Sequence, residues 1–119
     1  MICAGLGFNS AVCVAQLEDI VAQVAPDILA VLASKSQIAE FTHFRRRTPL
    51  TIVEIQPGDI DGIDTLTCSP RIKARFGTGS VAEALALVVA RRHSPQARLC
   101  APRQIGPDGT TTLALAETY

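Results

Sequence analysis

Two glycine-rich segments contain the residues of this chain whose types and spacing best suit ligand binding. They are Gly5-Leu6-Gly7-Phe8-Asn9-Ser10 and Gly77-Thr78-Gly79-Ser80-Val81-Ala82-Glu83. In each, paired glycines precede a serine that can cap a helix. Glycine lets a ligand approach the backbone closely, and a helix start offers unpaired N–H donors and the positive end of the helix dipole. We therefore predict that both segments form corners of a pocket for a negatively charged small molecule.

Each segment also has an interpretation that needs no ligand. The first lacks the third glycine of the dinucleotide fingerprint, because Ser10 stands in its place, so we expect no nicotinamide or flavin cofactor. It can equally be a tight turn. In the second, Ser80 and Glu83 form the pattern of a capping box, in which each side chain accepts from the other residue's backbone N–H. A capping box does not require Gly77 and Gly79, so a structural and a binding role both remain open.

Other charged and polar residues give weaker patterns. Lys35 directly follows a predicted strand, where α/β sheets place ligand-binding groups. The basic run 45–47 has no interleaved aromatic residues, which favours a solvated connection over a rim that attracts carboxylates. The acidic loop 59–64 places its glycine fourth and has Pro70 where the EF-hand needs glutamate, so no metal site is expected. His43 and His93 lack a patterned nucleophile, and no catalytic triad is predicted.

Composition excludes several classes of partner. Lysine and arginine together number 11, as do aspartate and glutamate, so no overall charge attracts nucleic acid or an anionic membrane. No apolar run reaches the roughly 18 residues of a membrane span, and the N-terminus has no basic region typical of a signal peptide. The four cysteines form no C-x-x-C pair and are typical of reduced, mostly buried thiols. We expect a cytoplasmic protein.

Apolar periodicity and turn residues predict the elements that must position these residues. The expected fold is an α/β sandwich of one domain, residues 1–119, with a mixed, mostly parallel sheet, helices on both faces and a C-terminal hairpin. The predicted strands are Ile2–Ala4, Ile28–Ala33, Leu50–Ile55, Leu99–Ile105 and Thr111–Ala116. The predicted helices begin at Ser10, Ser36, Ser69-Pro70 and Ser80 and end near Val24, Phe44, Phe76 and His93.

The run Gly77-x-Gly79-Ser80-Val81-Ala82-Glu83-Ala84-Leu85-Ala86-Leu87 closely resembles the signature of the CobE/CbiG C-terminal domain family of cobalamin (vitamin B12) biosynthesis. Weaker landmarks follow in the family's order: Gly5-x-Gly7-Phe8, Leu32-Ala33-Ser34-Lys35, Ser69-Pro70 and the closing Thr112–Ala116 strand. The resemblance covers essentially the whole chain. After Gly-x-Gly-Phe, where the family often has arginine, this chain has Asn9.

The resemblance implies a function in the corrinoid pathway. In CbiG, this domain is the C-terminal part of a longer enzyme that opens a lactone ring in cobalt-precorrin-5A and releases acetaldehyde. The present chain looks like the stand-alone members of the family, so we expect a protein that binds or acts on a precorrin-type tetrapyrrole, with other cobalamin-pathway enzymes as further partners. The implied ligand-binding residues are Gly5, Gly7, Asn9, Ser10, Lys35, Ser69, Gly77, Gly79, Ser80 and Glu83.

Two alternatives remain at this stage. The absence of a recognisable acid–base pair favours a non-catalytic carrier or scaffold that passes intermediates between pathway enzymes, and it leaves the catalytic residues unassigned. Glycine corners suit phosphates as well as carboxylates, so a nucleotide or phosphosugar binder is the second alternative.

Overall fold

The computed structural model describes residues 1–107 and 109–118, which form six strands and five helices. In chain order these are β1 (Ile2–Phe8), α1 (Val14–Ala22), β2 (Ile28–Leu32), α2 (Ala39–Arg47), β3 (Thr51–Ile55), α3 (Pro57–Ile60), α4 (Pro70–Phe76), α5 (Val81–His93), β4 (Arg98–Leu99), β5 (Gln104–Ile105) and β6 (Thr111–Glu117). Within the described ranges, no helix combines the length and apolar character that crossing a membrane requires.

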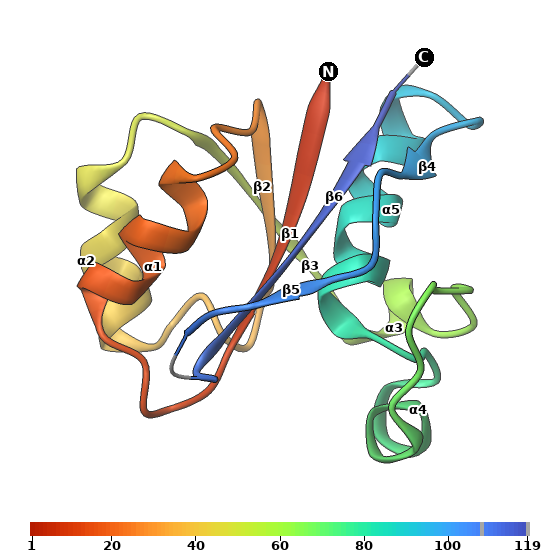
Figure 1. The fold of residues 1–119 in the computed structure, drawn as a ribbon, viewed down its shortest axis with the longest axis horizontal. Helices are drawn as coiled ribbons and strands as arrows, with labels where there is room; N and C mark the ends of the chain where they lie inside the picture. The colour runs from red at the N-terminus through yellow and green to blue at the C-terminus, as the bar shows by residue number, and fades with distance from the viewer. Residues whose placement is uncertain (108, 119) are drawn as a thin grey trace.

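A single mixed sheet runs through the middle of the molecule (Figure 1). Its strand order is β3-β2-β1-β6-β4, and β5 pairs with β6 beside this path. Strands β1, β2 and β3 are parallel, whereas β6 pairs antiparallel with β1 along its whole length, from Ile2 opposite Glu117 to Phe8 opposite Thr111. The predicted α/β fold with a mixed sheet and a closing antiparallel hairpin is therefore confirmed.

Helices cover both faces of this sheet, because side chains alternate along each strand. In β1, Ala4, Leu6 and Phe8 point into a core with α1 and α2, where the rings of Phe8 and Phe41 stack with centroids 5.4 Å apart. Cys3 points to the opposite face, which α5 covers together with α3. Figure 1 shows the two helical layers on either side of the strands.

On the α5 face, the central strands β1 and β6 are built from small residues, whereas Ile28, Leu32 and Ile55 lie further out on β2 and β3. Gly5, Ala30, Ala114 and Ala116 lie beneath the buried alanines of α5. A Cβ atom on Gly5 would overlap the Ala82 carbonyl oxygen and lie 2.7 Å from the Ala86 backbone nitrogen. Glycine at position 5 therefore lets helix α5 approach the central strand closely.

This packing corrects the prediction for the first glycine segment. Strand β1 does not end at Gly5 but continues through both glycines to Phe8. The next helix begins at Val14 with Cys13 as its N-cap residue, and Ser10 is exposed in the preceding turn. The Cys13 N–H donates to Oε1 of Gln16, the third residue of the helix, at 2.8 Å, which is a typical capping contact at a helix start. The segment is a strand followed by a loop, and it is not a helix-start corner.

The remaining elements follow the predictions with local differences. Ser36 does not cap α2, whose N-cap residue is Ile38; the Ser36 hydroxyl instead lies within hydrogen-bond distance of two acceptors, the Ala33 carbonyl oxygen at 2.7 Å and the Glu54 carboxylate. Ser69 caps α4 and Ser80 caps α5, as predicted. The predicted strand Leu99–Ile105 is split into β4 and β5, and the segment that joins the two predicted hairpin strands contains residue 108, which lies outside the described residues.

Candidate functional site

A cavity of about 430 Å³ opens at the carboxyl ends of the parallel strands. Its walls are the ends of β1 and β2, the beginning of β6, the first turn of α5, and helix α4. The volume lies within the range of small-molecule sites in proteins. This cavity is our candidate functional site.

The sheet topology explains why a cavity forms here. From β1 the chain moves outward to β2 and β3 on one side, and β6 later fills the other side. At the carboxyl edge of the parallel strands, β1 and β2 are followed by helices on one face of the sheet, α1 and α2, whereas β3 is followed by α3 and α5 on the other face, and residues of both sets of connections line the crevice. In α/β proteins this crevice is the usual place for a ligand.

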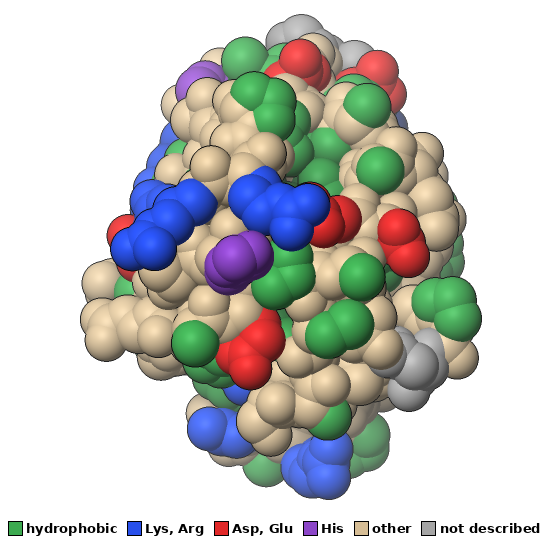
Figure 2. All heavy atoms as spheres, turned by 90° about the vertical axis from the view of Figure 1, so that its left-hand side faces the viewer, with side chains coloured by type: hydrophobic (Ala, Val, Ile, Leu, Met, Phe, Trp, Pro, Cys, Tyr) green, Lys and Arg blue, Asp and Glu red, His purple; other side chains and the backbone are tan. Residues whose placement is uncertain are grey.

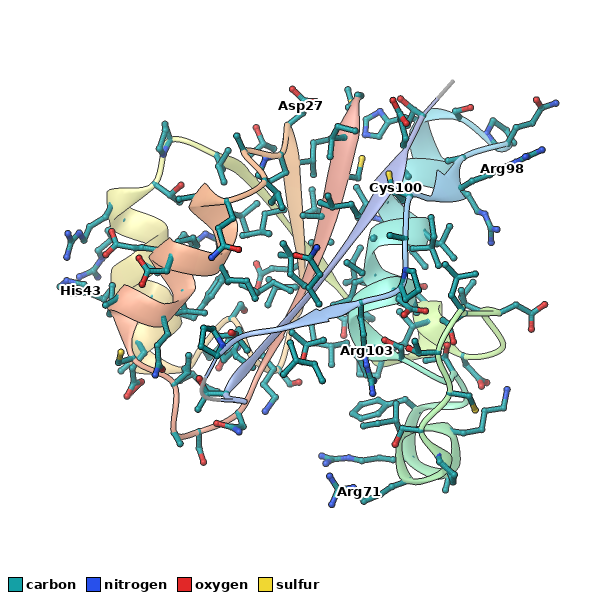
Figure 3. The ribbon with its side chains drawn as sticks, in the orientation of Figure 1. Asp27, His43, Arg71, Arg98, Cys100 and Arg103 are labelled. Carbon is teal, nitrogen blue, oxygen red and sulfur yellow. The ribbon has the colours of Figure 1, made fainter. Side chains whose placement is uncertain are left out.

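Four positively charged side chains line this cavity: Lys35, Arg71, Arg75 and Arg103. The described part of its lining contains no aspartate or glutamate. The ion pairs found among the described residues involve Arg45, Arg47 and Arg92, and therefore none of the four. Figure 3 shows Arg103 pointing from the segment before β5 towards α4, which carries Arg71. The cavity is thus a local cationic site in a chain without net charge.

The first turn of α5 adds hydrogen-bond donors to the same wall. Ser80, Val81 and Ala82 line the cavity, and the Ser80 hydroxyl accepts from the Glu83 N–H at 3.4 Å. The N–H groups of the first turn have no acceptor within the helix, and the positive end of the helix dipole lies here. Both features favour a negatively charged group, as the four cations do.

The structure brings together four of the ten residues that the sequence analysis assigned to the ligand site. Gly7, Asn9, Lys35 and Ser80 all line the cavity. The other six are not among its described lining residues, and they are Gly5, Ser10, Ser69, Gly77, Gly79 and Glu83. Their own contacts explain what they do in the fold.

Gly77 and Gly79 have a structural role, because the loop 61–68 packs directly against them. A Cβ atom on Gly79 would lie 2.6 Å from both Thr65 Oγ1 and the Thr67 carbonyl oxygen. Gly77 ends α4 in a left-handed conformation, with φ of 75°, that glycine adopts readily. Backbone bonds from the Gly62 N–H to the Gly77 carbonyl and from the Ser69 N–H to the Gly79 carbonyl join the two segments. These glycines hold the loop close to the start of α5.

Glu83 is completely buried, and its carboxylate does not form the predicted capping box with Ser80. Its Oε1 accepts from the backbone N–H groups of Leu66 at 2.7 Å and Thr67 at 3.0 Å. Its Oε2 accepts from the Thr67 hydroxyl at 2.7 Å and the Arg103 N–H at 2.9 Å. Burial raises the pKa of the Glu83 carboxyl, but these hydrogen bonds outweigh burial and lower it below its ordinary value.

Three of the four cations, Arg71, Arg75 and Arg103, were not predicted from the sequence. Arg71 and Arg75 are four residues apart on α4, a spacing that places both on one side of a helix, and this was a usable signal. The Arg75 guanidinium lies over the Phe76 ring, 5.0 Å from its centroid, and both residues line the cavity. Arg103 has no such local signal, because it reaches the cavity only through the pairing of β5 with β6.

The basic run Arg45–Arg47 lies elsewhere, in the last turn of α2 on the other face of the sheet. Arg45 pairs with Glu54 at 3.6 Å and Arg47 with Glu18 at 3.4 Å. Figure 2 looks onto this face, where positive and negative side chains are interleaved. His43 also lies on α2, far from Arg71 and Arg103 (Figure 3). The run is a solvated helix end and does not form the rim of the cavity.

The four cysteines are free thiols, as predicted, but only Cys3 is buried. Burial raises the pKa of the Cys3 thiol. Cys13, Cys68 and Cys100 are exposed, so the expectation of mostly buried thiols is wrong for them. They lie in loops whose neighbours are turn residues, outside the apolar faces that bury a side chain.

Comparisons with known proteins agree with this fold. The family model described as cobalamin synthesis G C-terminus matches residues 2–116. The crystal structure of CobE, a protein from the cobalamin biosynthetic pathway, is similar with a TM-score of 0.77 and 21% identity, over 100% of this chain and 91% of that one. The cobalamin biosynthesis protein chiG from Agrobacterium tumefaciens strain C58 is similar with a TM-score of 0.68 and 23% identity, over 99% and 98% of the two chains. A search of curated proteins found no significant match.

Proposed function

The chain belongs to the cobalamin synthesis G C-terminus family, and we propose that it binds a precorrin-type tetrapyrrole of cobalamin biosynthesis in the cationic cavity. The single observation that carries this proposal is the charge of the cavity. Four cations and the start of α5 converge on a space whose described lining has no carboxylate. Precorrins carry many acetate and propionate side chains, and guanidinium groups bind carboxylates through paired, charge-assisted hydrogen bonds.

The rest of the lining suits the other part of such a ligand. Ile72, Phe76 and Val81 line the cavity and are only partly buried, so they give it an apolar component beside its cations. A tetrapyrrole has the same division, since its apolar ring carries its carboxylates at the periphery. We expect the ring edge to lie against the apolar residues while the carboxylates reach the arginines and the first turn of α5. The proposed site differs from the one expected from the sequence, because we assign anion binding to the arginines in place of the first glycine segment.

Titration of the purified protein with hydrogenobyrinic acid, followed by absorbance, tests the proposal. We expect binding that weakens as salt concentration rises, because the contacts are between charges. Arg103→Ala should weaken binding by about tenfold to a hundredfold, which corresponds to the free energy of one hydrogen bond to a charged group. Arg46→Ala, which removes an exposed cation from α2, is the matched control and should bind like the wild type. No binding by the wild type, or equal losses in the two variants, would refute the proposal.

A non-catalytic carrier is a second candidate function. Apart from its apolar residues, the described lining consists of cations, hydroxyl groups, one asparagine amide and backbone groups, all of which suit holding carboxylates. Incubation of the protein with a precorrin, followed by mass spectrometry, separates the candidates. A product of changed mass supports an enzyme, whereas bound and unchanged precorrin supports a carrier.

The same cavity chemistry would also attract phosphates. A thermal-shift comparison of hydrogenobyrinic acid with nucleotides and phosphosugars separates these ligands, because a ligand that binds only the folded state raises the melting temperature. A larger shift with a nucleotide or phosphosugar than with the corrinoid would contradict the tetrapyrrole proposal.

A further inference from the structure

Glu83 is a completely buried carboxylate whose partners lie far from it in the sequence. It accepts four hydrogen bonds, from Leu66, Thr67 (twice) and Arg103. A buried charge is costly unless it is fully hydrogen-bonded, and an ionised carboxylate can only accept. Here each oxygen accepts from two donors, so the group is satisfied as an anion.

These four bonds join the two walls that carry the arginines of the cavity. On one side, residues 66–67 continue through Ser69, the N-cap residue of α4, to Arg71 and Arg75. On the other side, the Arg103 N–H is bound directly, at 2.9 Å, and the Arg103 side chain lines the cavity. Glu83 itself is not among the described lining residues, so it acts on the cavity through its partners.

We propose that Glu83 is a positioning residue, which holds the Arg103 backbone so that the guanidinium group meets a ligand carboxylate. Three observations carry this proposal: the complete burial of Glu83, the direct bond to the Arg103 N–H, and the place of Arg103 in the cavity wall. It rests on the proposed function for the identity of the ligand, and on geometry alone for the placement of Arg103.

The variant Glu83→Gln separates positioning from general support of the fold. Glutamine keeps one acceptor oxygen and replaces the other with an NH₂ donor. If the oxygen stays at the position of Oε1, the Leu66 and Thr67 N–H groups keep their acceptor. The Thr67 hydroxyl can then rotate to accept, whereas the Arg103 N–H can only donate and faces another donor. The opposite orientation would leave two N–H groups without an acceptor, so we expect the first.

The experiment measures amide hydrogen exchange at Arg103 and binding of hydrogenobyrinic acid, in wild type, Glu83→Gln, Arg103→Ala and the double variant. We expect Glu83→Gln to speed exchange of the Arg103 amide by about tenfold or more and to weaken binding by about tenfold. In the Arg103→Ala background the same change should weaken binding by less than about twofold, because residues that act as one unit are not additive. Ile20→Val, on the opposite face of the sheet, is the control for a general loss of stability.

Each outcome decides the proposal. Unchanged exchange at Arg103 in Glu83→Gln would overturn it, as would full additivity in the double variant or an equal loss of binding in Ile20→Val. If the wild type does not bind hydrogenobyrinic acid, the proposed function fails, and the exchange measurement still decides whether Glu83 positions Arg103. Should Glu83→Gln not fold, Thr67→Val loosens Oε2 by removing its hydroxyl bond while the carboxylate stays in place; we then expect faster exchange of the Arg103 amide, and unchanged exchange would overturn the proposal.

Discussion

Replacing Gly5 with alanine should destabilise the protein strongly, although it adds a single methyl group. The new Cβ atom would overlap the Ala82 carbonyl oxygen and lie 2.7 Å from the Ala86 nitrogen and 3.0 Å from the Ala82 carbonyl carbon. All three are backbone atoms of α5, so no side-chain rotation can relieve the contact. The helix must move away from β1, and its buried alanines, Leu85 and Val89 then lose packing against the sheet.

The expected magnitude follows from this geometry. Overpacking a core typically costs 1–3 kcal/mol, and a clash with helix backbone belongs at the upper end, so we expect a loss of about 3 kcal/mol or more in the free energy of unfolding. That is a large fraction of the roughly 5–15 kcal/mol that stabilises an ordinary domain. For a chain of 119 residues it corresponds to a melting temperature lower by about 10 °C or more.

Gly7→Ala is the matched control, because it makes the same chemical change two residues further along β1. Its Cβ atom would meet nothing closer than the Thr112 Cβ atom, at 3.9 Å, which is ordinary van der Waals contact. We expect its free energy of unfolding to lie within about 0.5 kcal/mol of the wild type, or slightly above, because alanine loses less backbone entropy than glycine on folding.

Urea unfolding monitored by circular dichroism, with thermal melts in parallel, measures both variants. Wild-type stability of Gly5→Ala would refute the packing argument, and so would an equal loss in Gly7→Ala. If Gly5 instead served close approach of a ligand, Gly5→Ala would keep its stability and lose binding. The two interpretations of this glycine therefore predict opposite results.

Three further predictions concern the start of α5 and its loop. The pKa of Glu83 is lower in the folded than in the unfolded protein, where it is about 4.3. Ionised Glu83 therefore stabilises the protein above the unfolded pKa, and this contribution is lost as pH falls through the folded pKa. In urea titrations, the difference in unfolding free energy between wild type and Glu83→Gln should narrow between pH 6 and pH 3. Gly77→Ala should cost more than Gly62→Ala in the same assay: both have φ near 75–79°, but only at Gly77 would the Cβ atom overlap the Asp61 carboxylate. Ser80→Ala should lower the free energy of unfolding by about 1 kcal/mol through loss of the α5 cap, and an unchanged value would show that the cap contributes nothing.

Features that depend on neighbours in the sequence were predictable. Ser69 caps α4 and Ser80 caps α5, and each cap joins residues three positions apart, so their types alone indicate the helix start. The strands Ile28–Leu32 and Thr51–Ile55 follow from apolar runs between turn residues. The order of these elements was enough to predict the mixed sheet with helices on both faces.

The first helix start was predicted wrongly because several residues there are possible caps. Ser10 is a common N-cap residue, yet Cys13 takes that position, since Gln16 reaches back to its N–H. The end of β1 was missed for a related reason, because glycine is a frequent turn residue and a rare one inside strands. Only the helix packed over Gly5 explains why a strand passes through it.

By itself the sequence determined the order of the elements, two of the helix caps and, through the run from Gly77 to Leu87, the family. The tertiary structure alone decided what the glycines and Glu83 do. Gly5 meets Ala82, 77 positions away, and Glu83 binds Leu66, Thr67 and Arg103, 16 to 20 positions away. The cavity likewise collects its four cations from three separate stretches of chain. Helix caps and strand patterns depend on residues that are near neighbours in the sequence. The close approach of α5 to β1, the burial of Glu83 and the clustering of cations in the cavity depend on which distant segments the folded sheet places side by side.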